Sequence, residues 1–177
     1  MRLLKRTVHP DISDFSGSVF YREAARAIIL DGDKILMLYT ARYHDYTLPG
    51  GGIDEGEEIE AGLIRELQEE TGARHIRDIV PFGLYEEYRP WYKPDFDIMH
   101  MKSFCFTCRI DSQLGDTQLE SYEIQNGMKP VWINIHEAIA HNQETIAKSE
   151  KKGLSVEREL FLLQCIRDEL LTVTKAV

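Results

Sequence analysis

The pattern of apolar and polar positions predicts strands in the first third of the chain. Ala24 to Leu30 and Lys34 to Tyr39 form two apolar runs, and Asp31-Gly32 between them is a strong hairpin signal. Residues 1–20 show no clear period and are expected to form a lead-in or an edge strand. Residues 43–52 predict a loop with a short strand, ending in Leu-Pro-Gly-Gly-Gly.

The middle of the chain predicts a helix between strands. Residues 58–71 have helical periodicity, and Gly72 is expected to end this helix in the left-handed conformation. Ile76 to Tyr88 and Met99 to Ile110 predict two longer strands, separated by the Pro- and aromatic-rich segment 89–97.

The last third predicts a loop, a strand and two helices. Residues 111–129 are polar and rich in turn residues, so we expect a loop before a short strand at Val131 to Ile135. A helix around residues 136–141 and a charged connection at 148–153 follow. Ser155 is expected to cap a C-terminal helix over residues 154–173. Its apolar stripe, which predicts core packing, is Leu160, Leu163, Ile166 and Leu170.

This order of elements indicates an α+β fold, with a central sheet sandwiched by helices. The 177 residues suit one domain spanning 1–177, with 43% apolar and 29% charged residues. The net charge of −9 argues against non-specific binding to DNA or to an anionic membrane. A local basic groove remains compatible with that overall charge.

The N-terminus and the cysteines indicate a cytoplasmic protein. The basic N-terminus has only Leu3 and Leu4 as an apolar pair, and no window approaches the ~20 apolar residues of a membrane span. The chain has three cysteines, which fits a reducing compartment. Cys105 and Cys108 have the C-x-x-C spacing of zinc and redox sites, but on a strand they point to opposite faces. We therefore expect structural thiols.

Acidic residues dominate the segment from Asp54 to Glu70, where Arg65 is the one cation. At helical spacing Glu66, Glu69 and Glu70 share one face, where like charges are destabilising unless something neutralises them. The alternative is a solvated acidic surface, but such helices normally alternate in sign. Gly62 within the helix also suggests a close approach by another group. Convergent carboxylates are typical ligands of Mg²⁺, which bridges carboxylates to substrate phosphates.

These residues resemble the Nudix box at every fixed position, with Ala73 standing where a larger aliphatic residue is more usual. The flanking Leu48-Pro49-Gly50 and Val131-Trp132-Ile133 are also similar to the family's surroundings. The resemblance implies the Nudix-type α/β/α sandwich with a central mixed sheet. The matching pattern is Gly51-x5-Glu57-x7-Arg65-Glu66-Leu67-x-Glu69-Glu70-x-Gly72-Ala73.

The resemblance implies a pyrophosphohydrolase that uses Mg²⁺ or Mn²⁺ to cut a nucleoside diphosphate linked to another moiety. The implied metal ligands are Glu57, Glu66, Glu69, Glu70 and the backbone of Gly51. Arg65 would orient the carboxylates. Glu70 is the first choice for the base that takes the proton of the attacking water, with Glu69 also expected to be catalytic; the rival bases are Glu120 and Glu123 in the 111–129 loop.

The rest of the substrate is expected to contact residues outside the box. The candidates are Tyr88, Arg89 and Trp91, together with Arg42. Arg22 and Arg26 could also meet phosphates, although a solvated surface charge is the favoured interpretation of each. Two alternatives stay open: a catalytically silent nucleotide-binding regulatory module, and an RNA 5′-end pyrophosphohydrolase. The family also makes a homodimer possible.

Overall fold

The computed structural model describes residues 1–91 and 93–171, and its strands form two sheets. Hydrogen-bonded neighbours in the first sheet follow the order β1-β6-β7-β2. In the second, β4 lies between β5 and β8 and also pairs with β3. The strands are β1 Leu3–Val8, β2 Val19–Ile28, β3 Leu30–Asp31, β4 Lys34–Thr40, β5 Asp45–Thr47, β6 Arg77–Pro90, β7 Ile98–Arg109 and β8 Met128–Asn134.

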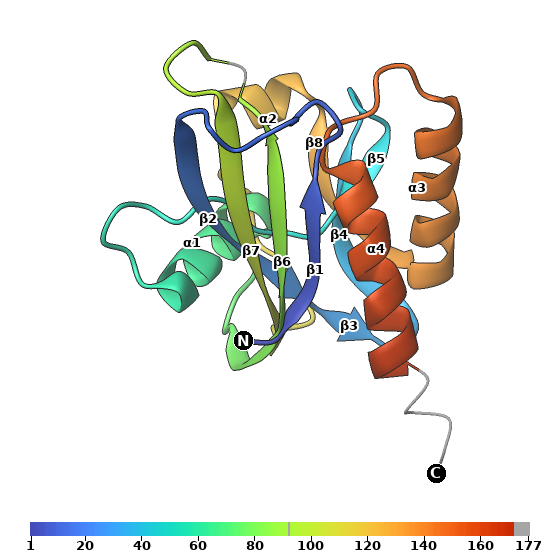
Figure 1. Ribbon diagram of the computed structural model, residues 1–177. Helices are drawn as coiled ribbons and strands as arrows, with labels where there is room; N and C mark the ends of the chain where they lie inside the picture. Colours follow the sequence, from blue (N-terminus) through green and yellow to red (C-terminus); the bar gives the residue numbers. More distant parts are fainter. Residues whose placement is uncertain (92, 172–177) are drawn as a thin grey trace.

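The first sheet is mixed, because β1 runs parallel to β6 and β2 parallel to β7, whereas β6 and β7 are antiparallel. The helices lie on both sides of the strands, with α1 on one side and α3 and α4 on the other (Figure 1). This arrangement confirms the predicted α+β class with a central mixed sheet. The helices are α1 Ile59–Thr71, α2 Ser121–Gln125, α3 Ile135–Lys148 and α4 Val156–Ile166, which continues into a π-helical turn, Arg167–Leu171.

Two buried clusters hold these layers together. One joins β4, β6 and β7 to α3 and α4 through residues such as Met37, Tyr85 and Leu162. The other packs α1 against β2 through residues such as Leu63 and Ala27. Because each layer buries its apolar side against a neighbour, the elements that carry the acidic residues are held rigidly.

Details of α1 agree with the sequence. Gly72 ends the helix with φ 69°, a left-handed conformation that glycine adopts without strain. Gly62 is closely approached, because a Cβ there would lie 2.5 Å from Cδ1 of Ile53. Cys105 and Cys108 are both buried free thiols in the two different clusters, which confirms their predicted structural placement on opposite faces of the strand.

Several predicted boundaries were wrong. β2 begins at Val19 instead of Ala24, because parallel pairing with β7 extends the strand through polar residues that local periodicity does not mark. The expected 111–129 loop contains α2 and the start of β8. Ser155 occupies the cap position of α4, but its side chain makes no capping hydrogen bond. Residues 1–20 do contribute an edge strand, β1. Residues 172–173 of the predicted helix lie outside the described residues.

Candidate active site

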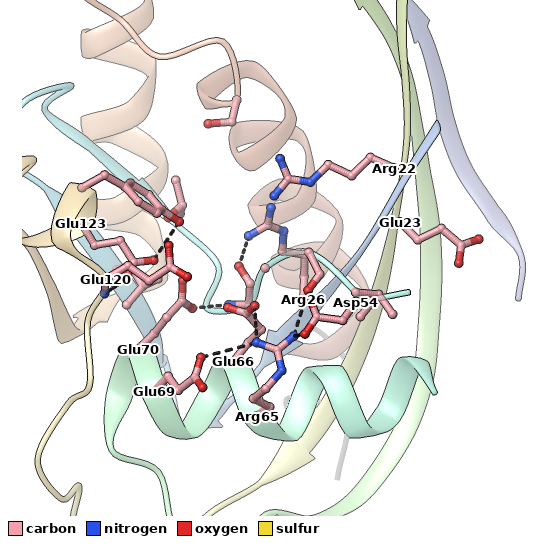
Figure 2. Close-up of a pocket in the computed structure, with 18 of the residues that line it drawn as sticks. Arg22, Glu23, Arg26, Asp54, Arg65, Glu66, Glu69, Glu70, Glu120 and Glu123 are labelled. Carbon is pink, nitrogen blue, oxygen red and sulfur yellow. Dashed lines mark hydrogen bonds and ion pairs between the residues drawn. The ribbon is translucent and has the colours of Figure 1, made fainter. Parts of the chain in front are cut away.

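A cleft of about 1490 Å³ is bounded by α1, the glycine-containing loop before it, β2 and the segment around α2. Figure 2 shows Glu66, Glu69 and Glu70 on α1 together with Arg65, and Arg22 and Arg26 on the other side. The charged residues that line it include Arg22, Arg26, Glu57, Arg65, Glu66, Glu69, Glu70, Glu120, Glu123 and Arg158.

The three glutamates of α1 lie on the face that borders the cleft, as the helical spacing predicts. Glu70 is 5% exposed, and the backbone N–H of Gly50 donates a 2.6 Å hydrogen bond to its Oε2. A Cβ on Gly51 would lie 2.4 Å from Oε2 of Glu66. The absent side chain at Gly51 therefore makes room for a carboxylate directly against the loop backbone.

Arg65 connects the carboxylates of Glu57 and Glu66 through hydrogen bonds and fixes their positions. Its Nε and Nη2 donate to the two oxygens of Glu57, both at 2.9 Å, and its Nη1 donates to Glu66 at 2.8 Å. The contact with Glu69, expected from i, i+4 spacing, is longer at 3.4 Å. The Arg65 hydrogen bonds lower the pKa of Glu57 to about 2. This geometry supports an orienting role for Arg65, whose guanidinium is already occupied by acids.

Glu70 differs from its neighbours because it is buried. Burial raises its pKa to about 8, although the Gly50 hydrogen bond and the charge of Arg26 act in the opposite direction. Burial also raises the pKa of Glu123. Both oxygens of Glu123 are hydrogen-bonded, one by the backbone N–H of Glu120 and the other by the hydroxyl of Tyr122. Glu70 and Glu123 are thus both buried carboxyl groups that line the cleft.

The donor set fits a hard divalent cation. Within residues 1–91 and 93–171 no group of three or more Asp, Glu, His or Cys side chains is closed enough to hold an ion by itself. Mg²⁺ does not require such a cage, because it keeps several waters and takes one or two carboxylates together with substrate phosphates. Carboxylate oxygens beside an unobstructed Gly51 backbone supply that kind of open site.

The structure places one of the predicted substrate residues outside the box at the cleft and the others away from its lining. Trp91 lines the cleft, but the lining does not include Arg42, Tyr88 or Arg89. Arg42 donates a hydrogen bond to Asn126 at 3.1 Å, and Tyr88 stacks on His100 with ring centroids 4.2 Å apart. Arg89 forms an ion pair with Glu87 at 3.4 Å. Tyr92, another aromatic residue of that segment, lies outside the described residues.

Reasoning from the sequence alone undervalued one feature of the cleft and missed another. Arg26 is half-buried and lines the cleft, which corrects its interpretation as a solvated surface charge. Arg22 also lines the cleft but is exposed, as expected for a solvated charge. Asp45 is 1% exposed, its Oδ1 has no hydrogen-bond partner, and burial followed by the nearby Glu159 raises its pKa to about 6. The signal for Asp45 in the sequence was its position directly before the Tyr-Thr-Leu-Pro run.

Comparison with known proteins identifies the family of this chain. The family model for the NUDIX domain matches residues 20–154, which include α1, the loop before it and the strands on both sides. The chain belongs to the Nudix family. Among solved structures, a nudix hydrolase family member from Chromobacterium violaceum aligns with a TM-score of 0.51 over 89% of this chain and 86% of that one. At 21% identity this similarity shows the Nudix fold alone.

Curated relatives share part of the sequence. An RNA pyrophosphohydrolase of Bartonella henselae is 46% identical over 92 residues, which is 52% of this chain and 46% of that protein. A mouse diphosphoinositol polyphosphate phosphohydrolase 3-alpha is 29% identical over 108 residues, 60% of this chain and 58% of that protein. The match thus spans about half the length of these Nudix relatives.

Proposed function

We propose that the protein is a divalent-metal-dependent pyrophosphohydrolase that cuts a phosphoanhydride bond in a nucleoside diphosphate linked to another moiety. One observation carries the proposal: Glu66, Glu69 and Glu70 border one cleft, and Glu66 lies against the loop backbone at Gly51. Family membership supports hydrolysis of pyrophosphate linkages. A cytoplasmic location and a homodimer stay predictions; among the described residues no helix is long and apolar enough to cross a membrane.

The carboxylates of Glu57, Glu66, Glu69 and Glu70, with the backbone of Gly51, are the groups that would hold Mg²⁺ or Mn²⁺. The bound cation supplies charge neutralisation at the phosphoryl oxygens and lowers the pKa of a bound water. Arg65 keeps Glu57 and Glu66 in place before any ligand arrives, so the site needs little reorganisation when the substrate binds.

Glu70 is our choice for the base that accepts the proton of the attacking water. Glu70 lines the cleft beside Glu66 and Glu69, and burial raises its pKa to about 8 in the metal-free protein. A bound cation would lower that pKa, so Glu70 would act as a carboxylate that can accept a proton. Glu120 and Glu123 are the rival bases, because both line the cleft. Trp91 is proposed to contact the remainder of the substrate.

The test is hydrolysis of a panel of nucleotides with Mg²⁺, followed by detection of a nucleoside monophosphate and a phosphorylated remainder. Chelation should abolish turnover, and Glu69→Gln or Glu70→Gln should lower kcat by orders of magnitude with the fold retained. Glu120→Gln and Glu123→Gln separate the candidate bases. Turnover that survives glutamine at positions 69 and 70 would overturn the site assignment. A folded protein inert on every substrate would favour a regulatory module.

RNA 5′-end pyrophosphate hydrolysis is the second candidate, because the Bartonella henselae relative carries that name and is 46% identical over 92 residues. Its substrate is a long polyanion, whereas this chain has a net charge of −9. The panel should therefore include 5′-triphosphorylated RNA. Release of pyrophosphate or phosphate from its 5′ end, at a rate above that for free nucleotides, would select this function.

A further inference from the structure

The cleft has a basic side that faces the acidic helix. Arg22 and Arg26 both come from β2, and Figure 2 shows their side chains directed into the cleft opposite Glu66 and Glu70. Because side chains alternate along a strand, two residues four positions apart leave β2 on the same face. The positive charge is thus concentrated at one side of the cleft although the whole protein is acidic.

Neither arginine side chain forms an ion pair in the described part of the chain, although the charges of Glu159 and Glu70 act on Arg26. Arg65 and Arg158, by contrast, each form ion pairs with glutamates. The one hydrogen bond of the Arg26 side chain goes from Nη1 to the carbonyl oxygen of Gly50, and its buried Nε has no partner. The side chain of Arg22 has neither a hydrogen bond nor an ion pair in the described residues. Burying the Nε of Arg26 without a hydrogen-bond partner is unfavourable, and the exposed guanidinium of Arg22 has no ion pair, so this arrangement leaves room for an external anion.

The glycine loop lies between the two charged sides. Nη1 of Arg26 holds the carbonyl of Gly50, and a Cβ on Gly52 would lie 3.1 Å from Nη2 of Arg22. On the other side, Gly51 lies against the carboxylate of Glu66. A ligand lying across the loop therefore meets the carboxylates at one end and the guanidinium groups at the other.

We propose that Arg22 and Arg26 form a subsite for an additional phosphate of the substrate, separate from the phosphoanhydride that is cut. The assignment rests on the proposed hydrolase function, whose substrates bring phosphates to this cleft. A planar guanidinium donates two parallel hydrogen bonds to phosphate oxygens, which makes arginine the matching residue. A purely structural arginine at position 26 would be expected to have a carboxylate partner, as Arg158 does.

Binding of inorganic tripolyphosphate in the presence of EDTA tests the subsite without catalysis. Titration calorimetry should show binding to the wild-type protein, and Arg22→Gln and Arg26→Gln should each raise Kd at least tenfold, which is about 1.4 kcal/mol. Arg22 is exposed, so its substitution preserves the fold even where Arg26→Gln is destabilising. Arg109→Gln, an exposed arginine on β7 paired with Asp78, is the matched control and should bind like the wild type.

The subsite is refuted when tripolyphosphate does not bind the wild type, or when it binds both cleft variants as tightly as the control. A second arm compares kcat/KM for diadenosine tetraphosphate and diadenosine diphosphate. The wild type should favour the longer compound, and Arg22→Gln should reduce that preference at least tenfold. When no nucleotide of the panel is hydrolysed the proposed function fails, while the calorimetric result still decides the subsite.

Discussion

Replacement of Glu70 by glutamine should stabilise the metal-free protein at neutral pH. Burial raises the pKa of Glu70 from 4.5 to about 8, so between these values the native state binds more protons than the unfolded chain. The stability contributed by the protonated form is complete below about pH 4.5 and is lost as the pH rises through 8. At about 1.4 kcal/mol per pKa unit this amounts to no more than ~5 kcal/mol. Water entering the cleft should reduce the measured effect to about 2–3 kcal/mol.

Urea unfolding in EDTA at several pH values between 5 and 8 measures this contribution. The free energy of unfolding of the wild type should fall across the range, and Glu70→Gln should remove most of the fall between pH 6 and 8. Asp45→Asn should reduce the fall only below about pH 6, where Glu70 also contributes, because burial raises the pKa of Asp45 only to about 6. Glu60→Gln, on the exposed side of α1, controls for the loss of one charge. If Glu70→Gln kept the wild-type slope from pH 6 to 8, the reasoning about burial would be refuted.

Three further outcomes are expected. Gly51→Ala should lower kcat/KM by roughly 10- to 100-fold with an unchanged urea midpoint. The reason is that the new methyl group displaces the flexible Glu66 carboxylate but no backbone. An unchanged kcat/KM would contradict the close approach of Glu66 to Gly51. Arg158→Leu should lower the free energy of unfolding by about 3–5 kcal/mol, because it leaves the fully buried Glu159 without its ion-pair partner at 2.8 Å. If denaturant titration gave a free energy of unfolding within about 1 kcal/mol of the wild type, Arg158 would not have this stabilising role. Millimolar Mg²⁺ should raise Tm for the wild type and much less for Glu69→Gln, as differential scanning fluorimetry can show.

Local patterns in the sequence determined the acidic face of α1. The spacing of Glu66, Glu69 and Glu70 places them on one side of any helix, whatever it packs against. The end of α1 at Gly72 and the opposite placement of the two cysteines of β7 are equally local, because they depend only on backbone conformation and strand alternation. The type and order of most elements were predictable for the same reason.

The tertiary structure alone decided what faces those glutamates. The i, i+4 spacing places Glu69 within reach of Arg65, yet the bidentate partner is Glu57 from the loop before the helix. The approach of Arg26 to Gly50 depends on pairing between β2 and residues 49–52, where the backbone N–H groups of Ala25 and Ala27 bond the loop carbonyls. Such long-range register depends on how whole sheets pack, so local hydrophobic periodicity does not encode it.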